Sequence, residues 1–584
     1  MIGYAGTGYR GMQITPDQPT IEGDLFKAMI AAGAISKANA SDPKKSSLVR
    51  CARTDKGVHA AGNVISLKLI VEDDDVVAKI NEHLPDQIRV WGIERTVGSF
   101  SCYQACDSRW YEYLIPTHSF LPPHPSSFLG KKLVELAEEV GDLDGHRQRQ
   151  AEVATWWEEA EERYIKPVLD EFDDDVRKEL LHARDKVDGV TSSFEDAWEE
   201  SDNEDMAEDE DGADYTTPGK DREQLARDSD GADKTTTTDA ECASDAGKSL
   251  EASNGLDESV TGRTDGGSAA PEPEAAQQGA RRKCIEAASR RLRQAYIAAK
   301  ATYRLSPQRL SRIKDTLAQF VGTFNHHNYT VRKAPTDPSA RRHIKSFEPV
   351  VAPSSTTDTG TYLIGDMEWL SIKVHGQSFM MHQIRKMVGM AALVVRCGRD
   401  PALVRATLWD DAVIAVPKAP SLGLLLERPV FATYNEQRAE KFGRGPVSFD
   451  RYEREMAAFK EREIYRRIHT EEAAAHVFHT FFAQIDEYKN KAFLYLTSKG
   501  LDATGRRDVT TKPVGKGVRH FFKKRGGGTT AEGETAAESK PEPDTKEARA
   551  GDAEGEADGG VEAKAGPAAQ DAKTVTEAAP SSTT

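Results

Sequence analysis

The chain has 584 residues and a formal net charge of −17, but this charge is distributed unevenly. Residues 191–280 contain 26 Asp and Glu against 6 Lys and Arg, and residues 526–584 contain 13 against 5, so the other 435 residues carry a net charge of +11. A basic folded part suits a phosphate-backbone partner, and because we find no signal peptide or long apolar run, we expect a soluble, intracellular protein without a membrane partner.

The first 117 residues are predicted to alternate short strands and helices. Apolar residues at helical spacing from Ile21 to Ile30 predict a helix that Thr20 caps, and Val76, Val77 and Ile80 predict a shorter one. Alternating or apolar stretches of β-branched residues predict strands at residues 47–50, 63–70, 88–92 and 109–116.

Residues 118–300 are predicted to be an insertion that separates two structured parts. Trp156, Trp157 and Tyr164 indicate amphipathic helices in its early part, and the acidic residues 191–280 are too poor in aromatic and β-branched residues to fold, so we expect disorder there. Beyond the insertion, the pattern predicts a basic helix at 308–321, strands at 344–351 and 369–374, and a helix at 381–397. A helical extension at 438–500 is expected to pack on the second half. A basic, then acidic, disordered tail is expected at 501–584.

One short stretch, residues 51–60, concentrates charge and glycine between two apolar segments. It reads Cys-Ala-Arg-Thr-Asp-Lys-Gly-Val-His-Ala and includes Arg53, Asp55 and His59. A carboxylate beside an arginine stays ionised, because the cation favours its charged form, and an ionised carboxylate is what a carboxylate nucleophile requires. Taken alone, an Arg-Thr-Asp-x-Gly string is usually a turn. Its interpretation therefore depends on the other motifs of the chain.

Three further motifs occur in a fixed order with residues 51–60, at residues 3–13, 109–114 and 379–389. Together the four motifs resemble those of the TruA family of tRNA pseudouridine synthases, and residues 322–330 and 419–427 resemble its eukaryotic, fungal-like branch. The resemblance covers residues 1 to about 117 and about 300 to 490. In this family the first strand begins several residues before the first motif, whereas Met1 here stands directly before Ile2, so we expect a truncated start or an initiator upstream.

The resemblance implies an α+β fold of two similar α/β halves, residues 1–117 and 301–437. The two halves are expected to join into one antiparallel-rich sheet with a central basic cleft. The activity implied is isomerisation of uridine to pseudouridine in tRNA, in the anticodon stem and loop region, with small nuclear RNA and mRNA as further candidate substrates. We favour a monomer.

The same resemblance implies three catalytic residues. Asp55 is the nucleophile, and Tyr111 stacks on the flipped base and serves as a base for a ring or sugar proton. Arg385 pairs with Asp55, and an arginine on a helix face with Met381 and Ile384 is too costly to bury without such a partner. Whether the nucleophile attacks the sugar or C6 of the base, or a C2′ proton is eliminated first, stays open at this point.

RNA contacts are expected from basic and polar residues within the motifs. Arg53 is expected to act as a wedge or phosphate contact, and His59 to be a structural hydrogen bonder rather than an acid or base. The full set of expected RNA-binding residues is Arg53, Lys56, His59, Arg109, His326, His382 and Lys386. The isomerisation requires no cofactor. Zinc is the one metal to consider, but neither the spacing of the six cysteines nor the adjacent His326 and His327 supports a site.

Two alternatives stay open. The main one is a non-catalytic protein that binds tRNA in the same cleft and assists its folding, although intact Asp55, Tyr111 and Arg385 argue against it. Another uridine-modifying enzyme would need a cofactor loop or a reactive thiol, which the sequence does not offer. Basic clusters at residues 281–283, 290–293 and 516–525 favour a nuclear location, with solvated helix faces as the alternative reading and the cytoplasm or mitochondrion as other locations.

Overall fold

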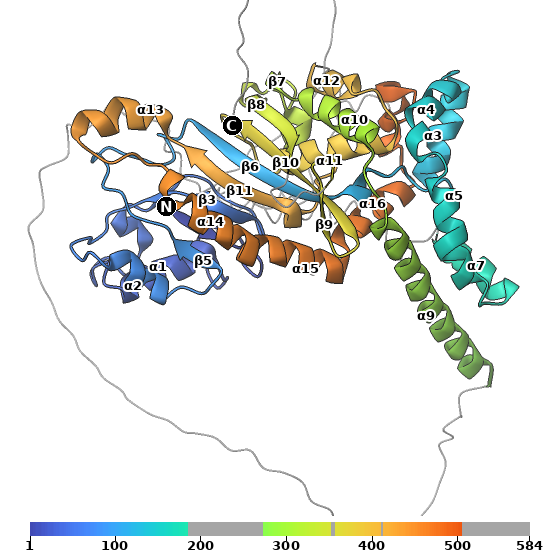
Figure 1. Cartoon of the computed structure of the whole chain (residues 1–584), viewed down its shortest axis with the longest axis horizontal. Coiled ribbons are helices and arrows are strands. Elements are labelled where there is room, and N and C mark those ends of the chain that lie inside the picture. The colour runs from blue at the N-terminus through green and yellow to red at the C-terminus, as the bar shows by residue number, and fades with distance from the viewer. Residues whose placement is uncertain (185–272, 352–356, 410–412, 505–584) are drawn as a thin grey trace, which may run out of the picture. The chain divides into compact units, whose positions relative to one another are not determined.

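A single mixed sheet forms the centre of the computed structural model, which describes residues 1–184, 273–351, 357–409 and 413–504 (Figure 1). Within these ranges nine strands run in the order β5-β1-β3-β11-β6-β10-β8-β7, with β9 paired to β10. Every pair is antiparallel except β3 with β11. The strands are β1 (Ile2–Tyr4), β3 (His59–Asn63), β5 (Ile88–Val90), β6 (Ser108–Pro116), β7 (Gly322–Asn325), β8 (Arg341–Val350), β9 (Tyr362–Ile364), β10 (Met367–Gly376) and β11 (Leu424–Val430). The prediction of an α+β fold with an antiparallel-rich sheet is confirmed.

The two halves exchange strands at the middle of this sheet. β6, the last strand of residues 1–117, pairs with β10 of the second half, and β11, the last strand of residues 301–437, pairs with β3 of the first half. β6 and β11 also pair with each other. The backbone hydrogen bonds at the centre of the sheet therefore need both halves of the chain.

The strand pattern near residues 51–60 differs from the prediction. The strand expected over residues 63–70 is reduced to β4 (Ile65–Ser66), which pairs only with β2 (Val49–Arg50), while the longer strand β3 lies inside the motif itself. β3 has the sequence His-Ala-Ala-Gly-Asn and is buried along its whole length. A strand buried on both faces shows no alternation of apolar and polar residues, so periodicity could not find it.

Helices cover the sheet where the apolar spacing predicted them. Thr20 caps α1 (Ile21–Ala31) by accepting a hydrogen bond from the Gly23 amide at 3.2 Å. α11 (Gln383–Arg396) is buried along almost its whole length, as expected for a central helix. The other predicted helices of the two halves are α2 (Val76–Glu82) and α10 (Pro307–Ala318), and the structure adds α12 (Ala402–Trp409) and the short α13 (Ala432–Tyr434).

Much of the predicted insertion is helical. Its helices are α3 (Phe128–Glu139), α4 (Leu143–Arg149), α5 (Trp156–Ala160), α6 (Lys166–Leu169), α7 (Asp174–Arg184) and α9 (Pro273–Ala301). α7 and α9 lie side by side and share a small apolar core that includes Trp157, Ile165 and Leu292 (Figure 1). Residues 273–280 were expected to be disordered but begin α9, where their Ala and Gln residues favour helix. Residues 191–272 lie outside the described residues, and so does the predicted disordered tail from residue 505 onward.

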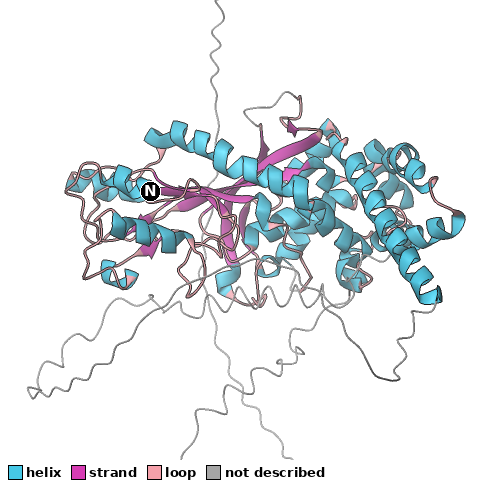
Figure 2. Ribbon diagram, turned by 90° about the horizontal axis from the view of Figure 1, so that it is seen from below, coloured by secondary structure: helices cyan, strands magenta, loops and turns pink. Residues whose placement is uncertain are grey.

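The helical extension comprises α14 (Glu453–Phe459), a π-helical turn (Lys460–Tyr465), α15 (Arg466–Ala475) and α16 (Val477–Glu487). Figure 2 shows the long helical run along one face of the sheet. Phe459 packs edge-on against Trp91 of the first half at 5.3 Å, and His469 packs against Trp369 of the second half at 4.8 Å. The extension therefore packs on both halves, whereas the sequence analysis expected it on the second half alone.

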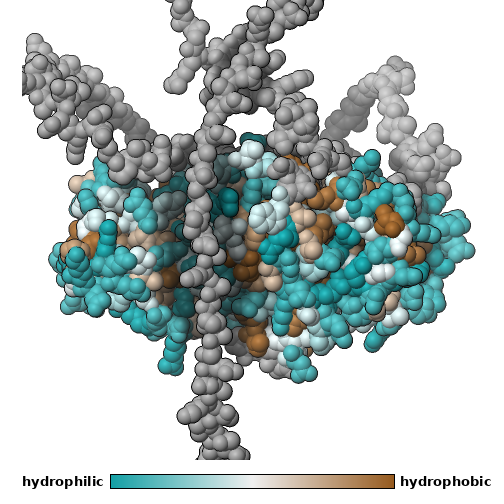
Figure 3. All heavy atoms as spheres, turned by 90° about the horizontal axis from the view of Figure 1, so that it is seen from above, coloured by the Kyte–Doolittle hydropathy of each residue, from teal (hydrophilic) through white to brown (hydrophobic). Residues whose placement is uncertain are grey.

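The surface seen from above is largely hydrophilic, with hydrophobic side chains scattered among polar ones (Figure 3). None of the helices in the described ranges has the length and apolar content that a bilayer-spanning helix requires.

Candidate active site

The loop that carries Asp55 is shaped by the first motif of the chain. The Met12 amide donates to the Thr54 carbonyl at 3.1 Å, and the Tyr4 hydroxyl lies 2.9 Å from Oγ1 of Thr54. A side chain at Gly6 would begin only 2.2 Å from the Val58 carbonyl oxygen, so residue 6 has to be glycine for the two segments to approach. The glycine-rich start of the chain thus fixes the backbone on which Asp55 stands.

His59 lies inside the sheet, in β3, with no exposed surface. Its Nδ1 accepts a hydrogen bond from the Gly6 amide at 3.1 Å, which links the motif at residues 3–13 to the motif at residues 51–60. Burial lowers the pKa of His59 to about 4, so the imidazole is neutral at physiological pH. The residue therefore has the structural role that the sequence analysis gave it, while the expectation that it contacts RNA does not agree with its position.

Asp55 pairs with a residue that the sequence analysis assigned to RNA. Oδ2 of Asp55 lies 3.2 Å from Nδ1 of His382, and the Asp55 side chain is 31% exposed whereas that of His382 is fully buried. His382 precedes α11 and has a φ of 58°, a left-handed conformation that is uncommon for residues other than glycine.

Arg385 does not form the predicted ion pair with Asp55. Among the described residues, the hydrogen bond of its guanidinium is from Nε to the Ala419 carbonyl, at 2.7 Å. Arg385 sits in the first turn of α11, where the loop before β11 offers this carbonyl, and His382 occupies the place next to the carboxylate instead. The need to satisfy a partly buried arginine was correctly identified, but a backbone carbonyl meets it in place of a carboxylate.

Tyr111 lies on β6 between β10 and β11, near enough to Asp55 for the charge of that carboxylate to act on its hydroxyl. Its ring packs edge-on against Phe379 at 5.2 Å with an interplanar angle of 80°, which joins the motif of β6 to the motif that begins α11. Burial raises the pKa of Tyr111, the nearby charge of Asp55 raises it further, and Arg109 opposes both. The phenol is therefore protonated at neutral pH, and it keeps an aromatic edge and a hydroxyl at the site.

The remaining predicted RNA contacts divide into exposed and buried residues. Arg53 and Lys56 are exposed beside Asp55. Arg109 is half-buried and donates to the Cys51 carbonyl at 2.9 Å, so it also braces the segment that carries Asp55. Lys386 is buried and donates to the Thr330 carbonyl at 2.8 Å. His326 is fully buried, and burial lowers its pKa to about 4.

The structure thus differs from the expected RNA surface at four positions. His59, His326, His382 and Lys386 were expected to contact RNA, but all four are buried and bond to protein groups. All four residues belong to the motifs. A motif alone does not show whether a side chain contacts the substrate or supports the site from within the protein. Across the described ranges, no three His, Cys, Asp or Glu side chains gather closely enough to hold a metal ion.

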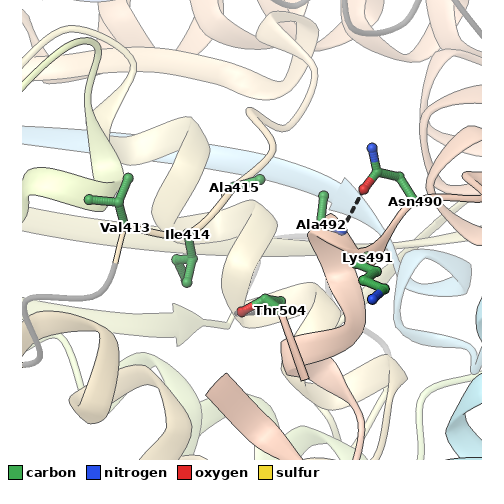
Figure 4. Close-up of a pocket in the computed structure, with 7 residues that line it drawn as sticks. All are labelled: Val413, Ile414, Ala415, Asn490, Lys491, Ala492 and Thr504. Atoms are coloured by element: carbon green, nitrogen blue, oxygen red, sulfur yellow. Dashed lines mark hydrogen bonds between the residues drawn. The ribbon is translucent and has the colours of Figure 1, made fainter. Parts of the chain in front are cut away.

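Sequence reasoning missed two contributors to the site. Phe379 begins the motif at residues 379–389, but the sequence analysis gave it no role. Its position before α11 and its aromatic ring were signals for a contact with Tyr111. His382 was assigned to RNA binding, and its contact with Asp55 was missed. Because it lies three residues before Arg385, both side chains could reach the same face at the start of α11. A pocket elsewhere in the molecule contains none of these residues; it is lined by Val413, Ile414, Ala415, Asn490, Lys491, Ala492 and Thr504 (Figure 4).

Comparison with known proteins finds one matching family model and several similar chains. A family model described as tRNA pseudouridine synthase matches residues 317–432. The chain is 40% identical over 506 residues to tRNA pseudouridine synthase 1 of Schizosaccharomyces pombe, an alignment that covers 86% of this chain and 85% of that protein. The protein of the same name from Yarrowia lipolytica is 38% identical over 516 residues, which cover 88% of this chain and 78% of that protein.

A third relative, tRNA pseudouridine(27/28) synthase of Saccharomyces cerevisiae, is 31% identical over 491 residues, which cover 83% of this chain and 98% of that protein. These alignments extend well beyond the motifs and include both halves of the sheet. From the sheet, the site and these relatives it follows that the chain belongs to the TruA family of tRNA pseudouridine synthases, isomerases that convert uridine to pseudouridine in tRNA without a cofactor.

Proposed function

We propose that this enzyme acts on uridines in the anticodon stem and loop region of tRNA, and that small nuclear RNA and mRNA are further substrates. The observation that carries the proposal is the meeting of Asp55, Tyr111 and Phe379 from three separate motifs beside two exposed basic residues, Arg53 and Lys56. The name of one relative specifies tRNA positions 27/28, which supports a site in this region of the substrate.

The reaction we propose rearranges bonds within one nucleotide. The bond between N1 of uracil and C1′ of the ribose breaks, the base turns, and a bond forms between C5 and C1′ while the hydrogen on C5 leaves and N1 gains one. Asp55 supplies the nucleophilic carboxylate, and Tyr111 packs on the flipped base, where its hydroxyl gives up its own proton as it accepts one from the ring or the sugar. Arg53 and Lys56 are suited to hold the phosphates that flank the flipped nucleotide.

Pseudouridine mapping tests the substrate range. RNA from cells that lack the gene is compared with RNA from the same cells complemented by the wild-type chain or by Asp55→Asn. We expect pseudouridines in the anticodon stem and loop of tRNA, and some in small nuclear RNA and mRNA, to disappear without the gene and to return only with the wild type. Sites that return with Asp55→Asn would contradict a catalytic role for Asp55, and tRNA that loses stability but no pseudouridine would favour the folding-chaperone alternative.

We propose that the protein works in the nucleus as a monomer. Two basic clusters lie on α9, where Arg281 and Arg291 form ion pairs with Glu179 and Glu171, so they are partly neutralised. The cluster at residues 516–525 lies outside the described residues and is the better candidate for a nuclear signal. Neutralising its lysines and arginines should move a fluorescent fusion to the cytoplasm, whereas neutralising residues 281–283 should not. Light scattering of the purified chain checks the monomer.

A further inference from the structure

The partner of Asp55 in this structure is a histidine, and we propose that His382 is a positioning residue for the isomerisation. Nδ1 of His382 lies 3.2 Å from Oδ2 of Asp55. The His382 side chain is fully buried, whereas that of Asp55 is 31% exposed. The imidazole thus approaches the carboxylate from the protein side and leaves the open side to RNA. This inference rests on the proposed role of Asp55 as the nucleophile.

The backbone around His382 is fixed by contacts on both sides. Thr330 donates from Oγ1 to the Met381 carbonyl at 3.1 Å, and Lys386 donates from Nζ to the Thr330 carbonyl at 2.8 Å. The Lys386 amide donates to the His382 carbonyl at 3.0 Å, which begins α11 directly after the histidine. A left-handed φ of 58° at a residue other than glycine is held only where surrounding contacts determine it, and such residues cluster at functional sites.

The geometry gives the histidine a specific task. With a proton on Nδ1, the imidazole donates to Oδ2 and fixes the rotation of the carboxylate. No described residue bonds the other carboxylate oxygen, Oδ1, which stays available to the substrate. Arg385 does not perform this task in the structure: among the described residues its guanidinium bonds the Ala419 carbonyl and forms no ion pair with Asp55. A reactive side chain that is held by a second, well-packed side chain stays within a fraction of an ångström of its working position.

Three substitutions of His382 separate the effect of losing the hydrogen-bond donor from the effect of changing the backbone conformation. His382→Asn places an amide N–H close to the position of Nδ1, and asparagine tolerates the left-handed region. His382→Gly removes the donor and also relieves the backbone. His382→Ala removes the donor and keeps a Cβ. The purified full chain is assayed with a tRNA transcript under single-turnover conditions, and the tRNA Kd is measured separately.

We expect His382→Gly and His382→Ala to lower the single-turnover rate about 10- to 100-fold, because a nucleophile displaced by about an ångström loses rate of this order. The tRNA Kd should change less than about 2-fold, since the histidine is buried behind the carboxylate. His382→Asn should restore the rate to within about 5-fold of the wild type, because it keeps the donor.

Two outcomes would overturn the proposal. If His382→Asn is as slow as His382→Gly, the hydrogen bond to Asp55 is not what matters. If the substitutions weaken tRNA binding and leave the rate on bound tRNA unchanged, His382 serves RNA binding, as the sequence had suggested. Asp55→Asn is assayed in parallel: retained activity there would refute the role of Asp55 itself, a failure distinct from that of His382. Thermal unfolding of the glycine variant establishes that the rate is measured on folded protein.

Discussion

The groups around Asp55, the proposed nucleophile, differ sharply in their access to solvent. Asp55 is 31% exposed, while Tyr111 and His382 behind it are buried. A substrate base can therefore reach the carboxylate at its exposed part, while the edge-on contact between Tyr111 and Phe379 holds the tyrosine ring in place. Substrate access to Asp55 and the orientation of its carboxylate are thus set by different residues. Mutations can therefore change one without the other.

Asp55→Asn should abolish pseudouridine formation and leave the tRNA Kd within about 2-fold of the wild type, because the amide keeps the shape of the carboxylate but is no nucleophile. Tritium release from C5-labelled tRNA measures the first and filter binding the second. Asp74→Asn changes an exposed aspartate elsewhere and should behave as the wild type. Measurable turnover by Asp55→Asn would remove this residue from the mechanism.

Tyr111→Phe should lower the single-turnover rate by about 10²- to 10⁴-fold, the usual range for a lost proton-transfer group, and change tRNA affinity little. The aromatic ring remains and can still pack on Phe379 and on a flipped base, so the loss isolates the hydroxyl. Tyr111→Leu serves as the comparison and should also weaken binding. If the phenylalanine variant turns over at the wild-type rate, the ring alone accounts for the role of Tyr111.

The sequence pointed to candidate residues of the site but not to their contacts. Asp55 and Tyr111 were chosen because their motifs are distinctive, and in the structure the charge of Asp55 reaches Tyr111. The partner of Asp55 was not predictable, because His382 and Arg385 share a helix start and only the three-dimensional fold decides which one reaches the carboxylate. His59 was misplaced for another reason: a polar residue in a short, fully buried strand of small residues gives no periodic signal.

At the scale of elements, one charged cluster fastens the helical extension to the sheet. Lys460 donates to Glu112 at 2.8 Å and to Glu427 at 2.6 Å, and the Tyr465 hydroxyl donates to the same oxygen of Glu112 at 2.8 Å. Lys460 and Tyr465 are the two ends of the π-helical turn, and the wider turn brings residues five apart onto one face. Since Glu112 directly follows Tyr111 on β6, this cluster supports the strand of the active site from its other face.

This cluster predicts an acid-dependent loss of stability. Burial alone would raise the pKa of Glu112, but Lys460 and Lys373 outweigh burial and lower it to about 2. Because the folded pKa is below the ordinary value, the ionised carboxylate stabilises the fold above about pH 4.5, and this contribution is lost as the pH falls toward 2. Glu112→Gln should lower the free energy of unfolding by about 1–3 kcal/mol at pH 7, a difference that shrinks below pH 4.

Urea unfolding of the wild type and Glu112→Gln between pH 3 and 8 measures this difference. Glu158→Gln, at an exposed position, is the control and should follow the wild type at every pH. A constant gap between the wild type and Glu112→Gln across this range would show that the charge of Glu112 is not what stabilises the extension.

At the scale of the whole molecule, we expect the acidic segment to be separable from the folded enzyme. Residues 191–272 contain 25 Asp and Glu against 6 Lys and Arg, and they connect α7 to α9, which lie side by side. A short Gly/Ser linker in their place should therefore leave folding and the rate on bound tRNA unchanged. The deletion removes a net charge of −19 from a protein that binds phosphates, so tRNA should bind more tightly at low salt and the gain should fade as salt rises.

A salt titration of tRNA affinity for both proteins tests this prediction. The matched control keeps the length and composition of residues 191–272 but scrambles their order. This variant should reproduce the wild-type curve. Loss of catalysis on deletion would show that the segment is part of the folded enzyme, and coincident salt curves would show that its charge has no effect on RNA.

The exchange of strands between the halves has a genetic consequence. β11 completes the pairing of both β3 and β6, yet it is among the last parts of the sheet to be synthesised. A premature stop codon between residues 112 and 424 therefore yields a product that contains Asp55 and Tyr111 but lacks the strand that joins β3 to β6, and such an allele should be null rather than partly active. A stop codon after residue 504 keeps every described element, and the shortened enzyme should remain active on tRNA in vitro. Comparing pseudouridine formation by the two truncated proteins would show that the catalytic surface of this enzyme arises only once β11 has been synthesised.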